Sequence, residues 1–283
     1  MPSPSPTTTR QLLDRYAGVL LDIYGVLADG TGRLPGAAEL ISELEHRRLP
    51  YRLVSNDASR SVETYVARFA SFGLRVDGSR FVTSGSLLPG YLQSRDLAGT
   101  RVAVLGTPDS EAFVRAGGGV VVPIERGMDL DVLAVCDDAG FAFLDGLEYT
   151  LSAVVRAVEA GRRPTLVLPN PDLVYPKSPG ELGFTAGTMA LMIEAALARR
   201  FPAANLVFDK LGKPEPHLFT AAAHQLGLPP DQLVMIGDQI ETDIAGAAAA
   251  GCDSALLAGA ISRWEESLAS HARATPTWLL EKL

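Results

Sequence analysis

Cysteine is scarce in this sequence, and it contains neither a long hydrophobic run nor an excess of positive charge. Cys136 and Cys252 are the only cysteines, so neither a disulfide framework nor a structural zinc site is expected, and a reducing cytoplasm fits best. No apolar run reaches the roughly 20 residues needed to span a bilayer. The formal net charge of -8 disfavours nucleic acid as the main partner. We therefore expect a cytoplasmic protein with no nucleic-acid or membrane partner.

The N-terminal segment lacks the features of a secretion signal. Residues 1–9 are rich in serine, proline and threonine, and no basic stretch followed by an apolar core is present. This composition is typical of a mobile polar tail, which we predict over residues 1–15. The chain as a whole has 47% hydrophobic and 20% charged residues. That balance is ordinary for a globular protein, and the length allows one or two domains.

What the sequence does contain is an alternation of short apolar blocks and longer helical stretches. Seven blocks have the length of strands, at residues 19–21, 51–54, 101–105, 130–135, 165–168, 206–208 and 233–236. Six stretches are typical of helices, at residues 36–48, 61–72, 151–160, 188–200, 216–226 and 242–250. The alternation predicts an α/β fold with a mostly parallel sheet that helices cover on both faces.

Three of the predicted strands end in polar residues. Asp22 follows the first, Ser55-Asn56 follows the second, and Gly237-Asp238 follows the last. A further polar segment, Gly212-Lys213-Pro214, stands at the start of a predicted helix. Ligands of α/β folds bind beyond the carboxyl ends of the strands. We therefore expect the four segments to meet in one crevice.

These residue types suit phosphoryl transfer. A carboxylate such as Asp22 can attack phosphorus and form an aspartyl-phosphate intermediate. Ser55 and Asn56 can hold phosphate oxygens through a hydroxyl, an amide and backbone N–H groups. Lys213 can neutralise charge that develops on the phosphoryl group. Each residue alone also fits ordinary turn or surface chemistry, so the interpretation depends on all of them lying together.

The segment that follows the last predicted strand indicates a metal site. Asp238 and Asp243 are about one helical turn apart, directly after an apolar block. Mg²⁺ prefers oxygen ligands and usually keeps several waters. Asp238 is therefore predicted as a direct ligand, and Asp243 as a ligand or an orienting group. The alternative is an acidic helix start, which the helix dipole favours.

Together these segments resemble the motifs of the haloacid dehalogenase (HAD) superfamily, and within it class IIA, the NagD-like sugar- and nucleotide-phosphate phosphatases. The resembling stretches are residues 21–27, 54–61, 83–85, 169–172, 212–216 and 236–244. The resemblance implies a Rossmann-like core over residues 16–95 and 171–283, with an inserted α/β cap of the C2 type over residues 96–170. It also implies a small phosphorylated metabolite as substrate, and it allows a homodimer.

The resemblance gives each segment a role, with Mg²⁺ as the cofactor. Asp22 is the nucleophile, Ser55 and Asn56 hold the phosphoryl group, and Lys213 stabilises it. The metal ligands are Asp22, the backbone carbonyl of Tyr24, Asp238 and Asp243.

Position 24 departs from the family pattern. Resembling phosphatases have a second aspartate two residues after the nucleophile, as general acid and base, whereas this chain has Tyr24. A positioned general acid contributes about 10²–10⁴-fold in rate. Tyrosine is ordinarily a poor base at neutral pH. Tyr24 could instead donate a proton, or its ring could simply pack against neighbouring side chains.

Two alternatives to a competent phosphatase therefore stay open. One is a catalytically weak protein that binds phosphate and metal. The other is a 2-haloacid dehalogenase, whose Asp-x-Tyr-Gly pattern is similar. Those dehalogenases need no metal and do not usually keep the segment from Asp238 to Asp243. Their cap lies between the first and second motifs, where the span from Asp22 to Ser55 is too short.

Overall fold

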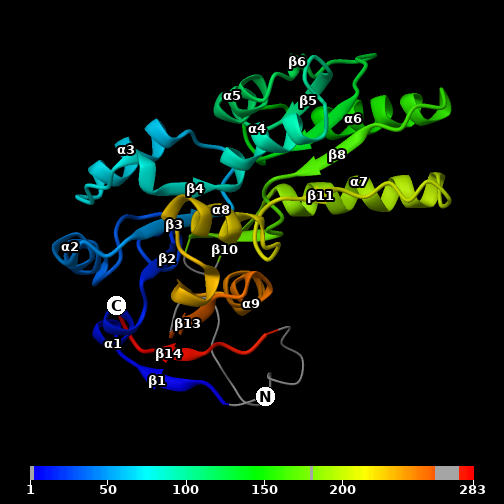
Figure 1. Ribbon diagram of the computed structural model, residues 1–283. Coiled ribbons are helices and arrows are strands. Elements are labelled where there is room, and N and C mark those ends of the chain that lie inside the picture. Colours follow the sequence, from blue (N-terminus) through cyan, green and yellow to red (C-terminus); the bar gives the residue numbers. More distant parts are fainter. Residues whose placement is uncertain (1–2, 179–180, 259–273) are drawn as a thin grey trace. The chain divides into compact units, whose positions relative to one another are not determined.

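The computed structural model describes residues 3–178, 181–258 and 274–283 (Figure 1). The chain divides into two units. The first unit is formed by Met1–Ser55, Val62–Val82 and Lys213–Leu283, and the second by Asn56–Ser61 and Thr83–Gly212. Each unit has its own parallel sheet with helices, which confirms the predicted α/β fold class.

The first unit is built on a seven-stranded sheet of order β1-β14-β13-β12-β2-β3-β4. Every pairing with a described register in this sheet is parallel. Strands β2 and β12 are buried along their whole length, as expected for strands covered on both faces. The strands are β1 (Ser5–Thr7), β2 (Gly18–Asp22), β3 (Tyr51–Ser55), β4 (Phe81–Thr83), β12 (Leu233–Gly237), β13 (Asp253–Leu257) and β14 (Trp278–Leu280).

Helices cover both faces of this sheet. On one face, Val19 and Leu21 of β2 pack with Leu40 and Phe69 in one hydrophobic cluster, to which α1, α2 and α3 all contribute. Leu20 lies between Val19 and Leu21 and points to the other face, where α8 contacts β2 and β3. The helices and helical turns of this unit are α1 (Thr9–Arg15), α2 (Ala37–Arg47), α3 (Val62–Ser71), η1 (Gly78–Arg80), α8 (His217–Leu226), η2 (Pro230–Gln232), η3 (Ile240–Ile244) and α9 (Ala245–Ala250).

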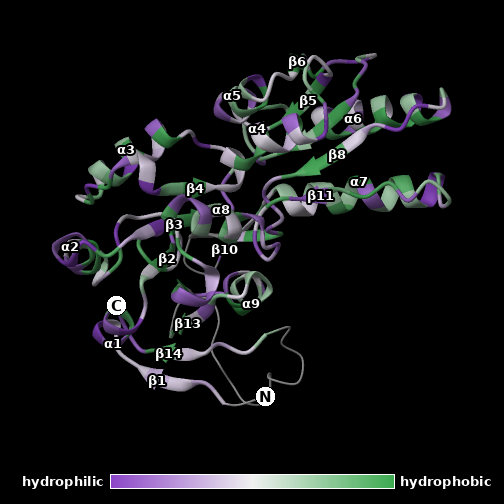
Figure 2. Ribbon diagram, viewed as in Figure 1, coloured by the Kyte–Doolittle hydropathy of each residue, from purple (hydrophilic) through white to green (hydrophobic). Residues whose placement is uncertain are grey.

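The second unit has a five-stranded parallel sheet of order β11-β8-β7-β5-β6 and a separate antiparallel hairpin of β9 and β10. Figure 2 shows β8 as a hydrophobic arrow, and its last three residues are buried. The strands are β5 (Arg101–Leu105), β6 (Val120–Val122), β7 (Val132–Val135), β8 (Thr165–Leu168), β9 (Val174–Ser178), β10 (Glu181–Phe184) and β11 (Asp209–Lys210), and the helices are α4 (Ser84–Ser94), α5 (Pro108–Ala116), α6 (Phe143–Glu159) and α7 (Ala186–Arg200). In the described part of the chain no helix combines the length and the apolar character needed to cross a membrane.

The predicted mobile tail is wrong for residues 5–15, which are folded. β1 pairs in parallel with β14, and α1 buries Leu12 and Leu13 in the hydrophobic cluster of the first unit. A capping box between Thr8 and Gln11 starts α1. Proline is tolerated on an edge strand, where one side of the backbone has no strand partner. β1 is such an edge strand, so Pro6 is compatible with it.

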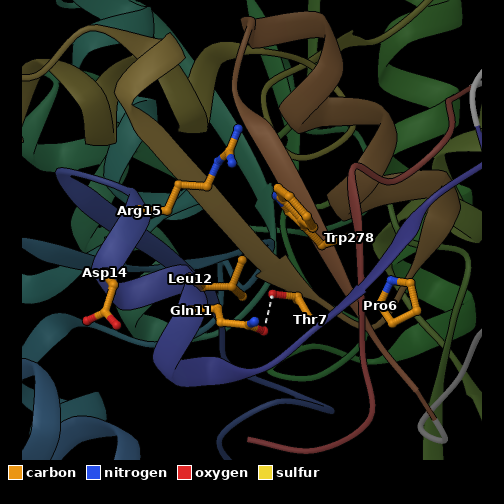
Figure 3. Close-up of a pocket in the computed structure, with 7 residues that line it drawn as sticks. All are labelled: Pro6, Thr7, Gln11, Leu12, Asp14, Arg15 and Trp278. Carbon is orange, nitrogen blue, oxygen red and sulfur yellow. Dashed lines mark hydrogen bonds between the residues drawn. The ribbon is translucent and has the colours of Figure 1, made fainter.

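The N-terminal segment also lines a cavity of about 350 Å³ beside β14 (Figure 3). The guanidinium of Arg15 lies 5.0 Å from the ring centroid of Trp278, and the hydroxyl of Thr7 donates to Gln11. The cavity lies where β1 and α1 pack beside β14. The sequence assigns chemistry to none of its lining residues. The lining residues are Pro6, Thr7, Gln11, Leu12, Asp14, Arg15 and Trp278.

Leu12→Ala is expected to lower the free energy of unfolding by about 2–5 kcal/mol, because it removes a buried side chain and leaves a cavity. Leu12 is 1% exposed. Urea denaturation measures the change. Asp14→Ala is the control on the same helix, because its carboxylate is exposed and its ion pair with Arg47 should contribute less than about 1 kcal/mol. Equal stability of wild type and Leu12→Ala would mean that α1 adds nothing to the fold.

The helix predictions at residues 36–48, 61–72, 188–200 and 216–226 are confirmed to within two residues at each end. The strand prediction at 206–208 is wrong, since these described residues form no strand and β11 follows at Asp209–Lys210. The helix predicted at 151–160 is the end of α6, which begins at Phe143.

The second unit extends beyond the segment expected to form the cap, residues 96–170. It also contains residues 83–95 and 171–212, as well as the short loop Asn56–Ser61. The physical reason is packing: α4 lies against α5, and α7 lies against β7 and β8. Helices α4 and α7 therefore bury their apolar sides within this unit.

Candidate active site

Three adjacent strands of the first unit end at the same edge of its sheet. β12, β2 and β3 are neighbours and run parallel, so their carboxyl ends lie side by side. Asp22 is the last residue of β2, Ser55 is the last residue of β3, and Asp238 directly follows β12. The geometry thus places these three polar positions at one edge, as the sequence predicted.

Lys213 forms two buried ion pairs, one with Asp22 and one with Asp243. Its Nζ lies 2.7 Å from Oδ1 of Asp22 and 2.7 Å from Oδ1 of Asp243. All three side chains are at most 6% exposed, so both charge-assisted hydrogen bonds are shielded from water. Burial alone would lower the pKa of Lys213, but the two carboxylates outweigh it and raise the pKa. Lys213 is therefore a cation at physiological pH.

The centre holds more negative than positive charge. Asp22, Asp238 and Asp243 offer carboxylate oxygens within 4.8 Å of one another, and with Lys213 they leave a formal charge of −2 when all are ionised. Burial, reinforced by repulsion from Asp243, raises the pKa of Asp22 to about 7. Burial and repulsion from Asp22 and Asp243 raise the pKa of Asp238 to about 8. A further positive charge in the cluster would stabilise the ionised forms of Asp22 and Asp238.

Asp238 is the carboxylate in this centre that most needs a positively charged partner. It is 0% exposed, and neither of its carboxylate oxygens has a hydrogen-bond partner among the described residues. A buried carboxylate in that state is costly unless it is paired or binds a metal. A cluster made only of carboxylate oxygens suits a hard divalent cation such as Mg²⁺.

Asp243 is engaged differently from Asp238. Its Oδ1 accepts from Lys213, and its Oδ2 accepts from the backbone N–H groups of Asp238 and Gln239, each at 3.1 Å. Both oxygens are therefore used within the protein. These hydrogen bonds are compatible with an orienting group, one of the two roles of Asp243 that the sequence left open.

The turn that carries Asp243 is a π-helix, Ile240–Ile244, and not the start of the α-helix predicted from residue 242. The wider turn brings the Asp243 carboxylate back to the N–H groups that follow β12. Single π-helical turns are frequent at functional sites. The two-carboxylate spacing was visible in the sequence, but the turn type was not.

Two glycines make room for the carboxylates. Gly25 has a φ of +90°, and a Cβ there would lie 2.1 Å from Oδ2 of Asp238. A Cβ at Gly237 would lie 2.4 Å from Cγ of Asp243. Any larger residue would force these carboxylates to move. The sequence assigned no function to Gly25, although this glycine belongs to the Asp-x-Tyr-Gly pattern that begins at Asp22.

The other predicted site residues have separate surroundings. Ser55 is buried at the end of β3. Asn56 is buried and belongs to the second unit, where its Nδ2 donates to Oδ1 of Asp172 at 2.8 Å. Tyr24 is partly buried and packs against the hydrophobic cluster of the first unit. The residues that the structure brings into one charged group are Asp22, Lys213, Asp238 and Asp243.

Asp238→Asn is expected to stabilise the metal-free protein by about 2 kcal/mol at pH 8, because it removes one charge from a buried centre with excess negative charge. The pKa of Asp238 is raised to about 8, so the folded state holds the proton more tightly than the unfolded state. That stabilisation is lost as the pH rises through about 8. The gain in Tm from the substitution, measured by calorimetry in EDTA, should therefore grow from pH 6 to pH 9.

Mg²⁺ should raise the Tm of the wild type more than that of Asp238→Asn, because only the wild type keeps the complete ligand set. Glu241→Gln is the matched control, since Glu241 is an exposed carboxylate in the same turn. It should leave both the metal-free Tm and the Mg²⁺ effect unchanged. A metal-free Asp238→Asn protein that unfolds below the wild type at pH 9 would contradict the charge imbalance.

Two family models match the chain. A haloacid dehalogenase-like hydrolase model matches residues 19–119, and a HAD-hydrolase-like model matches residues 210–283. The first matched segment contains Asp22 and Ser55, and the second contains Lys213 together with Asp238 and Asp243. The two matches together therefore include all four residues of the charged centre.

Similar proteins cover nearly the whole chain. Chronophin from Mus musculus is 30% identical over 267 residues, which cover 92% of this chain and 87% of that protein. The acid sugar phosphatase of Staphylococcus haemolyticus is 25% identical over 255 residues, with 90% and 89% covered.

Solved structures give the same picture. A structure described as a possible sugar phosphatase of the HAD superfamily, from Cytophaga hutchinsonii, has a TM-score of 0.85 at 27% identity, with 99% of this chain and 98% of that chain covered. NagD from E. coli K-12 has a TM-score of 0.77 at 22% identity, with 94% and 96% covered. At the lower identity the likeness concerns the fold.

Proposed function

The chain belongs to the haloacid dehalogenase-like hydrolase family, and we propose that it is a Mg²⁺-dependent phosphatase that hydrolyses a small phosphomonoester through an aspartyl phosphate on Asp22. The observation that carries the proposal is the buried Lys213 between Asp22 and Asp243, with the unpartnered carboxylate of Asp238 in the same cluster. The names of the acid sugar phosphatase and the possible sugar phosphatase support a phosphate ester as substrate.

Asp22 is proposed as the nucleophile. Its Oδ1 is held by Lys213, and Oδ2 would attack phosphorus. The bond from phosphorus to the leaving oxygen breaks as the bond to Asp22 forms, and the leaving oxygen acquires a proton. Water then attacks the aspartyl phosphate, which releases inorganic phosphate and restores the Asp22 carboxylate.

Lys213 is proposed to offset the negative charge that builds up on the phosphoryl group. Its two ion pairs hold the ammonium group beside Asp22 and Asp243, so little reorganisation of this group is needed during the reaction. Ser55 is proposed to hold phosphoryl oxygens through its hydroxyl. Asn56 would contribute through its backbone N–H, because its side-chain Nδ2 already donates to Asp172.

The acidic cluster fits a divalent cation, and we propose Mg²⁺. Bound there, the ion would withdraw charge from the phosphoryl oxygens and hold them beside the nucleophile. Asp22 and Asp238 are the proposed carboxylate ligands, and the backbone carbonyl of Tyr24 is a third. Asp243 would orient Lys213 and the loop after β12, which the hydrogen bonds of its two oxygens support.

A second candidate function is a protein that binds phosphate and metal but turns over slowly, and Tyr24 favours it. The tyrosine packs against the hydrophobic cluster of the first unit. Among the four residues of the charged centre, the carboxylates are assigned to attack, to metal binding or to orientation, and Lys213 is held between two of them. This group therefore has no member left to protonate the leaving oxygen.

The substrate is proposed to be a small phosphorylated metabolite, with a sugar phosphate ahead of a nucleotide because of the names of the relatives. The second unit is proposed as the cap that selects it, in place of the narrower segment 96–170. A cytoplasmic location and a homodimer remain expectations. The net charge of -8 continues to disfavour nucleic acid as a partner.

Removal of the metal tests the proposal. The purified protein is expected to release phosphate from an activated aryl phosphate in Mg²⁺. EDTA should lower the rate of release by at least about 100-fold, and restored Mg²⁺ should return the rate to its first value. Equal rates with and without EDTA would contradict the metal site. Halide release from a 2-haloacid in EDTA would instead establish dehalogenation.

A further inference from the structure

The chain crosses between the two units beside two of the proposed active-site residues. Asn56, the first residue of the second unit, follows Ser55, and Gly212, the last residue of that unit, precedes Lys213. Asn56 and Gly212 are themselves in contact, because a Cβ on Gly212 would lie 2.5 Å from Oδ1 of Asn56. Consecutive Cα atoms are about 3.8 Å apart. A residue that holds Asn56 and Gly212 in place therefore restrains the backbone directly next to Ser55 and Lys213.

Asp172 holds Asn56 at this contact. Its Oδ1 accepts a hydrogen bond of 2.8 Å from Nδ2 of Asn56, a charge-assisted bond to a side chain that is only 4% exposed. Gly212 is enclosed by the same loop, since its Cβ would lie 2.6 Å from the carbonyl oxygen of Pro169 and 2.7 Å from Cδ of Pro171. The loop Pro169–Asp172 thus contacts the chain at two of the four positions where it passes between the units, those at Asn56 and Gly212.

Hydrogen bonds hold the loop Pro169–Asp172 within the second unit. The backbone N–H of Asp172 donates to Oδ1 of Asn170, and Nδ2 of Asn170 donates to the buried hydroxyl of Thr185. The carbonyl of Asp172 accepts from the N–H of Gly187 at 2.9 Å, in the first turn of α7. Both backbone polar groups of Asp172 are therefore hydrogen-bonded within the second unit, the carbonyl directly to α7 and the N–H to Asn170, which makes Asp172 a well-positioned acceptor for Asn56.

We propose that Asp172 is a positioning residue: through Asn56 and Gly212 it sets the placement of Ser55 and Lys213. The proposal rests on the proposed phosphatase function, in which Ser55 holds the phosphoryl group and Lys213 stabilises its charge. A displacement of about 1 Å at such groups can cost about 100-fold in rate. Loss of the Asn56–Asp172 hydrogen bond should therefore act on the chemical step more than on substrate binding.

The first test compares Asp172→Ala with Asp172→Asn. Asp172→Ala is expected to lower kcat for an aryl phosphate about 10- to 100-fold with KM changed less than about threefold. Asp172→Asn keeps an Oδ1 acceptor for Asn56 and is expected to stay within about threefold of wild type. Asp131→Ala is the control for structure alone, since Asp131 accepts three hydrogen bonds from Arg101 in the same unit. It should lower Tm and leave kcat unchanged.

Two further variants approach the contact from its other members. Asn56→Asp sets two carboxylates against each other and should lower kcat, and the double variant Asn56→Asp/Asp172→Asn should restore it by exchanging donor and acceptor. Gly212→Ala places a Cβ against Asn56 and should lower kcat about tenfold. Gly90→Ala is its control, since a Cβ there meets nothing within 4 Å among the described residues.

The outcomes separate this proposal from the function on which it rests. Wild-type turnover with unchanged kcat in Asp172→Ala, or a double variant no better than Asn56→Asp alone, would overturn the positioning role. If the wild type shows no turnover, the dissociation constant of orthovanadate in Mg²⁺ replaces kcat as the readout, because orthovanadate mimics the phosphoryl group of the transition state. Binding weakened at least tenfold by Asp172→Ala, and restored by Asp172→Asn, would support the role. Unchanged binding would overturn it.

Discussion

Tyr24→Asp is expected to raise kcat for an alkyl phosphate by about 10²–10⁴-fold, because it supplies a carboxyl group that can protonate the leaving oxygen and later deprotonate the attacking water. Tyr24 stands two residues after Asp22, the proposed nucleophile. The gain should be smaller for an activated aryl phosphate, whose leaving group departs without a proton. Steady-state assays of both substrates in Mg²⁺ measure the difference.

The substitution also has a structural cost that the assay must separate from chemistry. The Tyr24 ring packs against the hydrophobic cluster of the first unit, so its loss is expected to lower stability by about 1–3 kcal/mol. Rates are therefore compared per folded molecule, at a temperature well below the Tm of each variant.

Two control variants identify what position 24 does. Tyr24→Asn matches the size of aspartate without its acidity, so Tyr24→Asp must exceed it for the general-acid argument to hold. Tyr24→Phe removes only the hydroxyl. Unchanged kcat in Tyr24→Phe is expected if the tyrosine merely packs, whereas a large loss would identify its hydroxyl as the proton donor. Equal kcat in Tyr24→Asp and Tyr24→Asn would mean that position 24 is not the limiting defect.

The core of the first unit was readable from the sequence because its central strands are apolar throughout and end abruptly in polar residues. β2 and β12 are buried over all five of their positions, and such runs are easily distinguished from polar turns. Once these strands are parallel neighbours, Asp22 and Asp238 must lie at one edge. The predicted meeting of Asp22 and Asp238 followed from that logic, whereas Lys213 was expected there as part of a polar segment at the start of a helix.

The N-terminal segment could not be predicted because its strand depends on a distant partner. β1 has three residues and pairs with β14, more than 270 positions along the chain. Local composition around Pro6 is typical of an unfolded tail, and only the docking of α1 through Leu12 and Leu13 reverses that expectation. Tertiary contacts of this kind leave no local pattern.

The partner of Asn56 was equally hidden. A strand-terminal Asn indicates turn chemistry or phosphate binding, and nothing local relates it to Asp172, 116 positions away. The same holds for the extent of the second unit, which depends on where α4 and α7 bury their apolar sides. The sequence therefore predicted which polar residues end the central strands better than it predicted what holds them in place.

Asp22→Asn is expected to reduce phosphate release by about 10³-fold or more, because the amide cannot attack phosphorus to form the aspartyl phosphate. The substitution is nearly isosteric and keeps an oxygen that can accept from Lys213. It also removes one negative charge from a centre in which burial and Asp243 raise the pKa of Asp22 to about 7. The variant should therefore fold at least as well as wild type in EDTA, so that a loss of rate reports on chemistry.

Asp29→Asn is the matched control for Asp22→Asn. Asp29 lies in the loop after β2, where its carboxylate accepts hydrogen bonds from Thr31 and Gly32, and its substitution should leave kcat within about twofold of wild type. Mass spectrometry of acid-quenched protein should detect a phosphorylated wild type and an unmodified Asp22→Asn variant. Phosphate release that survives Asp22→Asn would contradict Asp22 as the nucleophile. Asp238 and Asp243 would then be the remaining carboxylates of the cluster to test.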